Sequence, residues 1–407
     1  VADSMVSYNR EILNRADDSV VRLIDNRLTV IRRSRGFVPG PVEIKSDAEG
    51  ILAMGAEQKN SFCIGKGRQA IMSQYIGDLK NMATFDFYTA SVERFRKLFR
   101  FEPSYLACDL HPDYLSSQYA ESLENQLRIP LLKVQHHHAH IASCMAENFI
   151  DEEVIGVCFD GTGLGTDGTM WGGEFMIADL HNFRRYTHFD ETALPGGDKA
   201  VNEPWRTAFS YIRKYFGNDF DYFSLPAFRT IRKEKFSAVS EMLDKKINSP
   251  LSSGAGRLFD AVSAMSGLCA YSSFDSEAPV RLEAAISDST DEFYPFQAGN
   301  PIVFRDTLKE ILKEIPEQSV SIISAKFHNT ISRVILDVAV QIRNETSVNK
   351  VVLSGGVFQN KYLLEKSLYL LRKNEFETFT NHYVPPNDGG VSLGQLVIAS
   401  KIRELCA

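Results

Sequence analysis

Short apolar runs separated by polar turns open two parts of the chain, and amphipathic stretches with helical spacing fill much of the rest. The runs at 51–54, 62–64, 105–110 and 129–134 have the length and the bounding turns that are typical of strands. Between about 205 and 345 the apolar residues instead recur every three or four positions, which is typical of helices. The pattern therefore predicts an α/β fold with a largely helical insertion in its second part.

A weak internal repeat relates residues 51–79 to residues 154–180. Each segment begins with an apolar strand, crosses a polar turn, returns through a second apolar strand and ends in an apolar-x-Asp-Leu sequence. Because self-similarity within a sequence indicates repeated structural units, we interpret the two segments as the starts of two related lobes. We place lobe 1 at residues 45–150 and lobe 2 at residues 151–407.

Residues 1–44 form a separate block ahead of lobe 1. The alternating segments 19–23 and 28–33 flank Asp25-Asn26, and this arrangement predicts a β-hairpin. Pro39-Gly40-Pro41 then predicts a linker into lobe 1.

Charge and composition narrow the class of partner. The formal net charge is −7 and the sequence pI is about 5.8, which argues against a broad nucleic-acid surface. No apolar run is long enough to cross a bilayer, and the first residues lack the layout of a signal peptide. The six cysteines include no C-x-x-C pair, which is typical of reduced thiols. We therefore expect a cytoplasmic protein that binds neither nucleic acid nor membrane.

The histidine cluster at 135–140 is the sharpest chemical signal. His136 and His140 are four positions apart, so on a helix they share one face and can bind the same ion. The helical projection places Ser143 and Glu147 on that face as well. It places four apolar residues on the opposite, packing face: Ile141, Ala142, Met145 and Phe149. The pattern predicts a transition-metal site, and imidazole ligands suit zinc and iron equally.

Two histidines do not complete a metal site, so carboxylates must supply the remaining ligands. Asp160 and Asp388 are the candidates, because each lies at the carboxyl end of an expected strand or in the loop after it. Asp388 also precedes an expected helix, where a carboxylate is favourable without any metal.

Glycine-rich loops provide candidate phosphate-binding positions. The 160–168 loop, with Gly161 and Gly163, joins two expected strands, so it fits neither the P-loop nor the Rossmann pattern and could be a simple hairpin turn. The 354–356 loop joins a buried strand to a helix, where backbone N–H groups favour phosphate. Asn360, one turn later, is a candidate contact for a ribose or base.

Two further loops carry polar groups next to glycines. One contains Gly196, Gly197 and Asp198, and the other contains Arg257 and Asp260 at an expected helix start. Together they indicate a cleft lined with groups that bind phosphates and carbonyls.

These motifs, in this order, resemble the C-terminal half of the HypF family of hydrogenase maturation carbamoyltransferases. The resemblance covers residues 45–407 and is carried by six segments: 134–140, 159–165, 196–206, 256–262, 352–360 and 387–395. Residues 1–44 resemble the tail of that family's YrdC-like domain. The resemblance implies a two-lobed actin-like ATPase fold, also called ASKHA, which is built from a duplicated RNase H-like unit.

The resemblance also implies a reaction. Enzymes of this family make carbamoyladenylate from carbamoyl phosphate and ATP, and then move the carbamoyl group to the C-terminal cysteine of a HypE-like partner. His136, His140 and Asp388 would be metal ligands, with Asp160 a further ligand or close neighbour. We assign the remaining expected site residues to two groups. The catalytic candidates are Asp160, Asp198 and Arg257. The candidates for binding ATP or the adenylate, with Mg²⁺ as a further candidate ion, are Gly161, Gly163, Gly196, Gly197, Asp260, Ser354, Gly355, Gly356 and Asn360.

Other functions on the same fold stay open at this point. A threonylcarbamoyl transferase acting on tRNA or a small-molecule O-carbamoyltransferase would use the same histidine pair. A sugar- or acetate-kinase-like phosphotransferase would use the nucleotide loops but leave the histidines unexplained. A nucleotide-gated binding module would close its lobes around ATP without transferring a group.

Overall fold

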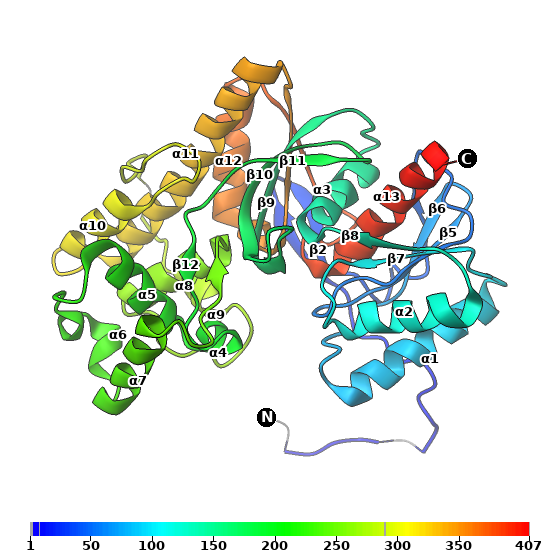
Figure 1. Ribbon diagram of the computed structural model, residues 1–407, viewed down its shortest axis with the longest axis horizontal. Helices are drawn as coiled ribbons and strands as arrows, with labels where there is room; N and C mark the ends of the chain where they lie inside the picture. Colours follow the sequence, from blue (N-terminus) through cyan, green and yellow to red (C-terminus); the bar gives the residue numbers. More distant parts are fainter. Residues whose placement is uncertain (1–2, 8, 289, 407) are drawn as a thin grey trace.

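A computed structural model describes residues 3–7, 9–288 and 290–406, and it shows two lobes joined at the top of an arch (Figure 1). Each lobe is built on one mixed sheet. Within the described residues, no helix combines the length and apolar character needed to cross a lipid bilayer.

The lobe 1 sheet has six strands in the order β3-β6-β5-β4-β7-β8. Its strands are β3 (Val42–Glu43), β4 (Ile51–Ala53), β5 (Cys63–Lys66), β6 (Gln69–Met72), β7 (Tyr105–Asp109) and β8 (Leu131–Val134). Two helices that belong to lobe 1 pack beside it, α1 (Met82–Leu98) and α2 (Leu115–Leu127).

The lobe 2 sheet has seven strands, six of them in the order β12-β13-β10-β9-β14-β15, with β11 also paired to β10. Its strands are β9 (Val154–Leu164), β10 (Met170–Ala178), β11 (Phe183–His188), β12 (Thr192–Ala193), β13 (Leu251–Ser252), β14 (Lys350–Ser354) and β15 (Glu377–Thr380).

The two sheets repeat one topology, which confirms the expected duplication. In lobe 1, β4 pairs antiparallel with β5, β5 pairs antiparallel with β6, and β7 and β8 follow parallel on the other side. In lobe 2, β9, β10, β11, β14 and β15 have the same order and the same directions. The expected alignment of the two segment ends was wrong, because β9 and β10 are longer than β4 and β5. Asp179 follows the second strand of its sheet, whereas Asp78 follows the third.

The expected helical insertion occupies one side of lobe 2 (Figure 1). It contains α4 (Asp198–Asn202), α5 (Pro204–Phe216), η1 (Tyr222–Ser224), α6 (Pro226–Arg229), α7 (Lys233–Asp244), α8 (Ala255–Met265), α9 (Glu277–Ala284), α10 (Arg305–Glu314) and α11 (Val320–Thr346). The short η2 (Gly356–Gln359) and α12 (Lys361–Lys373) follow β14. One continuous apolar core joins these helices to the lobe 2 sheet.

Two helices cross between the lobes. α3 (His136–Glu147) follows the last strand of the lobe 1 sheet but packs on β9 and β14 of lobe 2, where Ile141 fills the space beside Gly156. α13 (Val391–Cys406) is the last helix of the chain but packs on β4 and β7 of lobe 1. The two helices cross so closely that a Cβ at Gly394 would lie 1.8 Å from the carbonyl oxygen of Ala139. A boundary at 150/151 therefore separates the sheets but not the helices that cover them.

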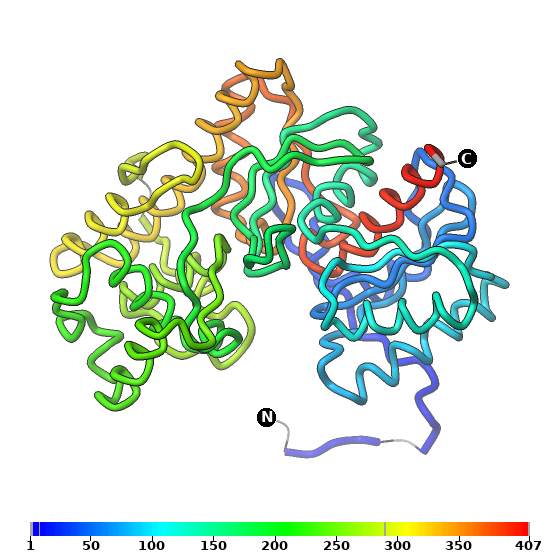
Figure 2. Tube along the Cα trace, viewed as in Figure 1, coloured from blue at the N-terminus to red at the C-terminus, as the bar shows by residue number. Residues whose placement is uncertain are grey.

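The expected hairpin is present as β1 (Val20–Ile24) and β2 (Arg27–Arg32). Its turn residues Asp25 and Asn26 have φ angles of 50° and 57°, as a type I′ turn requires. The trace in Figure 2 passes between the two lobes here, and the hairpin contacts both of them. The N–H of Val30 donates to the carbonyl of His382 at 2.8 Å, and the N–H of Tyr75 donates to the carbonyl of Arg33 at 3.1 Å.

Candidate metal centre and nucleotide cleft

Four side chains converge where the lobes meet: His136 and His140 from α3, Asp160 from β9, and Asp388 from η3 (Asp388–Gly390). Their ligand atoms all lie within 4.8 Å of one another. Nε2 of His136 and Nε2 of His140 are 3.2 Å apart. Oδ2 of Asp160 lies 3.4 and 3.5 Å from these nitrogens, and Oδ1 of Asp388 lies 3.8 and 3.7 Å from them.

The chain places each of these side chains through local structure. Gln135 caps α3 by accepting a hydrogen bond from the N–H of His138 at 2.9 Å, so the helix begins with the histidines. Asp160 lies within β9, two residues beyond Cys158, and therefore just past the carboxyl end of the part of β9 that pairs parallel with β14. The side chain of Asn387 accepts from the N–H of Gly389 at 3.0 Å and fixes the turn that presents Asp388.

The donor set fits a transition metal. Zinc bonds of about 2.0–2.2 Å to imidazole nitrogen and carboxylate oxygen place neighbouring ligand atoms about 3 to 4 Å apart, which is the spacing seen here. Burial opposes ionisation of Asp388, yet contacts from His136 and His140 outweigh it and lower its pKa to about 2. The same balance holds the pKa of Asp160 well below its usual range. Two ionised carboxylates opposite two imidazoles form a site for a cation, and zinc and iron both suit these ligands.

Asp109, the last residue of β7, is a candidate functional residue that the sequence reasoning missed. Its Oδ2 lies 2.7 Å from Nδ1 of His136, and its Oδ1 accepts from the N–H of His111 at 3.0 Å. A carboxylate on Nδ1 directs Nε2 of the same ring toward the metal position. The position at the carboxyl end of a strand, which selected Asp160, would have selected Asp109 as well.

The rest of α3 only partly follows the helical projection. Ile141, Ala142 and Met145 are buried as expected, but α3 is buried on all sides because both lobes cover it. Phe149 lies beyond the helix end and is 50% exposed, so its assignment to the packing face was wrong. Glu147 binds the 382–384 backbone that leads toward Asp388.

Two glycines of the expected phosphate loops, Gly356 and Gly163, lie against the same centre. A Cβ at Gly356 would lie 2.9 Å from Oδ1 of Asp160, and a Cβ at Gly163 would lie 2.9 Å from a ring carbon of His136. Gly355 has a φ of 104° and approaches the carbonyl of Phe159, so glycine is required there. The expected 160–168 loop is shorter than predicted, because β9 continues to Leu164 and only 165–169 forms the turn.

Arg257 and Asp260 form a buried pair behind this strand. Their closest atoms are 2.9 Å apart, and Arg257 also lies against Gly161. Burial raises the pKa of Asp260 to about 7 although Arg257 opposes the shift. Both residues belong to α8, whose first turn contacts β9.

Asn360 and Asp198, two further expected site residues, lie outside the four-ligand group. The Asn360 amide caps α12 through the N–H of Leu363 at 2.9 Å and contacts Nε2 of His328 at 2.8 Å, so both of its ends are engaged within the fold. Asp198 follows the Gly196-Gly197 turn and pairs with Lys80 of lobe 1 at 2.8 Å. Its side chain is 82% exposed, and it lies outside the four-ligand group.

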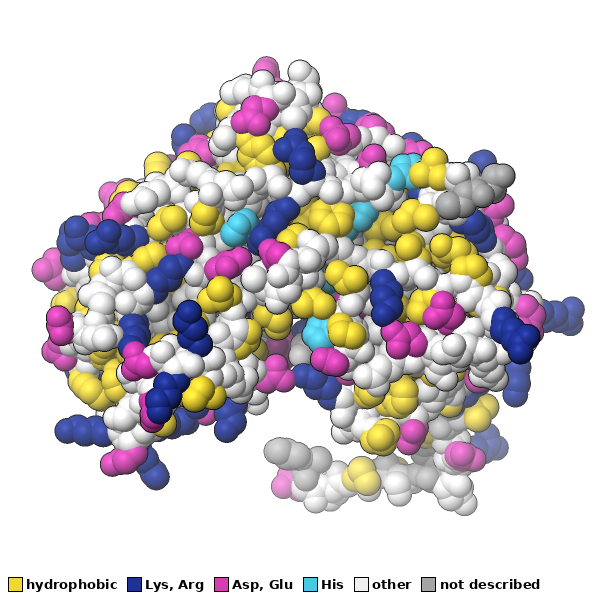
Figure 3. Space-filling model, viewed as in Figure 1, with side chains coloured by type: hydrophobic (Ala, Val, Ile, Leu, Met, Phe, Trp, Pro, Cys, Tyr) yellow, Lys and Arg dark blue, Asp and Glu magenta, His cyan; other side chains and the backbone are white. Residues whose placement is uncertain are grey.

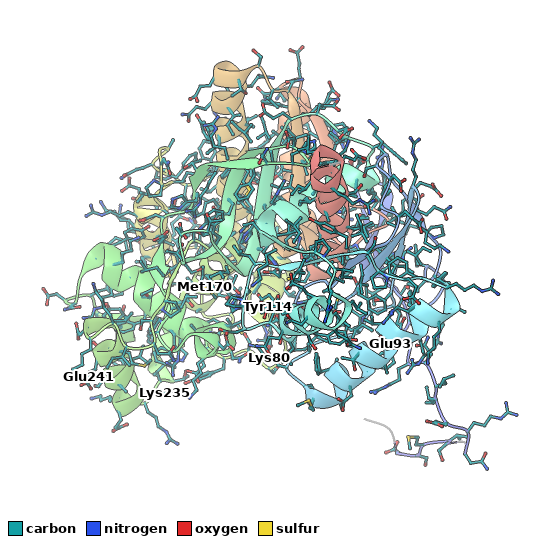
Figure 4. All side chains as sticks on the ribbon, turned by 45° about the vertical axis from the view of Figure 1, so that its right-hand side comes forward. Lys80, Glu93, Tyr114, Met170, Lys235 and Glu241 are labelled. Carbon is teal, nitrogen blue, oxygen red and sulfur yellow. The ribbon has the colours of Figure 1, made fainter. Side chains whose placement is uncertain are left out.

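The lobes border a notch that opens at the lower edge of the molecule (Figure 3), and acidic, basic and histidine side chains gather at its upper end. In Figure 4, Tyr114 lies at the junction of the lobes, with Lys80 on the side that faces the helical insertion. The Tyr114 ring stacks on His111 at 4.2 Å between centroids. Burial and then Asp109 raise the pKa of the Tyr114 hydroxyl.

This arrangement defines a class: a duplicated, two-lobed α/β domain of the actin-like ATPase type, with a candidate metal centre between its lobes. Residues 46–147 match the family model of the HypF Kae1-like domain. Residues 156–395 match the model of the second subdomain of the carbamoyltransferase Kae1-like domain. The chain belongs to the HypF family, and the expected fold is confirmed.

Named relatives agree with this assignment. Carbamoyltransferase HypF of Synechocystis sp. is 35% identical over 424 aligned residues, which cover 99% of this chain and 54% of the relative. A carbamoyltransferase HypF homolog of Cupriavidus necator is 32% identical over 88% of this chain and 93% of its own length. The chain spans about half the length of the first curated relatives that it matches.

Two solved structures share the fold over nearly the whole chain. Full-length HypF in the phosphate- and nucleotide-bound form is 42% identical, with a TM-score of 0.91 over 99% of this chain and 64% of that chain. HypF of T. kodakarensis is 34% identical, with a TM-score of 0.89 over 96% of this chain and 53% of that chain.

Proposed function

We propose that this chain transfers a carbamoyl group from carbamoyladenylate, the product of carbamoyl phosphate and ATP, to the C-terminal cysteine of a HypE-like partner. The observation that carries the proposal is the four-ligand group between the lobes, which lies directly against Gly356 of the 355–356 turn. The names of the relatives, carbamoyltransferase HypF, supply the reaction class.

The residues around the candidate centre have separate tasks in this reaction. His136, His140, Asp160 and Asp388 would hold the metal, with Asp109 fixing the ring of His136. When bound, a Lewis-acid metal supplies polarisation of a carbonyl or phosphoryl oxygen. Gly356 keeps the space beside the Asp160 carboxylate free of a side chain, so a ligand can approach the centre.

The acceptor thiol is expected to come from outside this chain. All five cysteines that the structure describes in detail are buried and free: Cys63, Cys108, Cys144, Cys158 and Cys269. Burial raises the pKa of Cys108 to about 12 and the pKa of Cys158 well above its usual value. A thiol with a raised pKa is a poor source of thiolate, so these side chains do not suit the role of nucleophile.

The test supplies the metal-loaded chain with carbamoyladenylate and a HypE-like partner, and follows the partner's C-terminal cysteine by mass spectrometry. The chain should add a carbamoyl group to that cysteine. His136→Ala and His140→Ala should lose bound metal and transfer together, whereas Lys133→Ala, which removes an exposed ion pair with Glu121, should retain both. A variant that lacks metal yet transfers at the full rate would reject the role of the centre. In a parallel reaction with tRNA in place of the partner, transfer to the tRNA would favour a tRNA-modifying activity instead.

A further inference from the structure

Lys59 lies in a loop that is fixed against the candidate metal centre. The loop joins β4 to β5, and Lys59 has a φ of 46°, a left-handed conformation that is unfavourable for a residue with a side chain. The side chain of the neighbouring Asn60 is also fixed, because its Nδ2 donates a hydrogen bond to the carbonyl of Met54 at 3.1 Å. Ser61 donates its hydroxyl to the carbonyl of Gly389, the residue after Asp388, at 2.7 Å. The backbone of Lys59 is therefore held beside the turn that presents a metal ligand.

The Lys59 side chain spans the cleft between the lobes. Its Nζ lies 2.5 Å from Oδ2 of Asp275, which precedes α9 in the helical insertion. The Lys59 and Asp275 side chains are 32% and 51% exposed, so the ion pair lies in the open part of the cleft. Asp388 and Asp160 also act electrostatically on the Lys59 ammonium. The ammonium group is thus paired with a partly exposed carboxylate, on a loop that is tied to the turn of Asp388.

We propose that Lys59 binds the phosphate of the adenylate, and that Asp275 holds the Lys59 ammonium until the nucleotide replaces it. This inference rests on the proposed function for the identity of the ligand. A nucleotide phosphate binds more tightly where a cationic side chain can donate a charged hydrogen bond to it. Arg257 is already paired with Asp260 inside the protein, whereas Lys59 is paired with an exposed carboxylate. Exchanging an exposed ion pair for a phosphate costs little, because such pairs are weak.

The transfer step gives this lysine a catalytic task. The partner's thiolate forms a bond from sulfur to the carbamoyl carbon, and the bond from that carbon to the phosphate oxygen breaks. The electron pair of the broken bond leaves with AMP, so negative charge grows on the phosphate. A charged donor placed where that charge develops stabilises the transition state. Lys59 is therefore a candidate catalytic residue that contacts the leaving group.

Lys80 provides a matched comparison within the same cleft. Like Lys59, it belongs to lobe 1 and pairs with a carboxylate of lobe 2, Asp198, at 2.8 Å. The carboxylates that act on Lys80 are Asp198, Asp78 and Glu57 rather than those of the metal centre. Removing Lys80 thus removes a cross-cleft ion pair without removing a charge from the centre.

The experiment measures binding of AMP and of adenosine to the metal-loaded chain by calorimetry, so it requires no acceptor protein. Lys59→Met should weaken AMP binding roughly tenfold or more and leave adenosine binding unchanged, as expected for loss of one charged hydrogen bond. Lys59→Arg should recover part of the loss, and Asp275→Asn should tighten AMP binding. Lys80→Met should change AMP binding much less than Lys59→Met.

Other outcomes would overturn the inference. Equal loss of AMP and adenosine binding in Lys59→Met would show a structural role, and so would an equal effect of Lys80→Met. Unchanged AMP binding in Lys59→Met, or weaker AMP binding in Asp275→Asn, would also reject it. If AMP binding depends on Lys59 but no carbamoyl transfer occurs, the proposed function fails while the phosphate contact stands.

Discussion

Oδ2 of Asp109 lies 2.7 Å from Nδ1 of His136, and both side chains are buried. This contact joins the end of the lobe 1 sheet to the helix that carries both candidate imidazole ligands. Burial opposes protonation of His136, but Asp109 and the other carboxylates outweigh it and raise the pKa of the ring. In the presence of a metal, the same carboxylate would strengthen Nε2 as a ligand.

Asp109→Asn should weaken metal binding by about 10- to 100-fold, because the neutral amide no longer orients and polarises the His136 ring. The change is measured as the metal that each protein retains after dialysis against increasing concentrations of a chelator. Asp113→Asn, in the exposed segment four residues later, is the control and should bind metal like the unsubstituted chain. Equal metal retention in all three proteins would contradict the role of Asp109.

Metal removal should destabilise the folded chain. A ligand that binds only the folded state adds about 4 kcal/mol at a thousandfold excess over its dissociation constant, so a chelator should lower the melting temperature. Asp388→Asn removes one of the two facing carboxylates and should abolish this chelator effect. Calorimetry with and without chelator makes the measurement. A chelator effect of the same size in Asp388→Asn would exclude Asp388 as a ligand.

Glu147 should make stability depend on pH. Its carboxylate accepts hydrogen bonds from the N–H groups of His382 at 2.7 Å, Tyr383 at 2.5 Å and Val384 at 3.2 Å. Burial nevertheless dominates and raises the pKa of Glu147 to about 7 from its usual 4.5. Between these two values the folded state binds the proton and the unfolded state does not. The contribution is therefore fully present below about 4.5 and is lost as the pH rises through about 7.

Urea denaturation at pH 5 and pH 8 tests this linkage. The unsubstituted chain should lose free energy of unfolding between pH 5 and pH 8. In Glu147→Gln this loss should be smaller by up to about 3 kcal/mol, since each unit of pKa shift corresponds to about 1.36 kcal/mol. Glu153→Gln, at an exposed position, should leave the pH dependence unchanged. A parallel pH dependence in Glu147→Gln and the unsubstituted chain would show that Glu147 does not titrate in this window.

Gly394→Ala should destabilise the crossing of α3 and α13. The added Cβ would lie 1.8 Å from the carbonyl oxygen of Ala139, so the helices must separate, at a cost of about 1 to 3 kcal/mol or more. Because α3 carries His136 and His140, metal affinity should fall together with stability. Denaturation curves and metal content make the measurement, and Glu404→Ala at an exposed position of the same helix is the control. Native stability in Gly394→Ala would mean that the helices can separate without loss.

The ligand set was accessible from the sequence because each signal was local. The spacing of His136 and His140 indicates one helical face, and Asp160 and Asp388 follow expected strands. Their convergence on one position is confirmed by the geometry, although their role as metal ligands stays a prediction. The duplicated topology could also be predicted, since the paired strands repeat one apolar pattern.

What could not be predicted depends on contacts between distant segments. Nothing in the 391–406 pattern shows which sheet the helix covers, because an apolar face fits either one. The projection of α3 placed Glu147 on the same face as the histidines but could not show that the 382–384 backbone would bind its carboxylate. Lys59 lies in a polar turn whose sequence is typical of an ordinary surface loop. Its proposed role in phosphate binding depends on its ion pair with Asp275, 216 positions later.

The exchange of α3 and α13 between the lobes has a consequence for biosynthesis. The two imidazoles are on a helix whose outer side is covered by residues 391–406, and one apolar core joins both helices to the two sheets. During translation, lobe 1 would emerge with one face of its sheet uncovered, and more than half of the chain would have to be synthesised before α13 could cover that face. The four candidate ligands can therefore take up their final positions only after α13 has been synthesised. A prematurely terminated polypeptide would fail to retain metal rather than form a partly active enzyme.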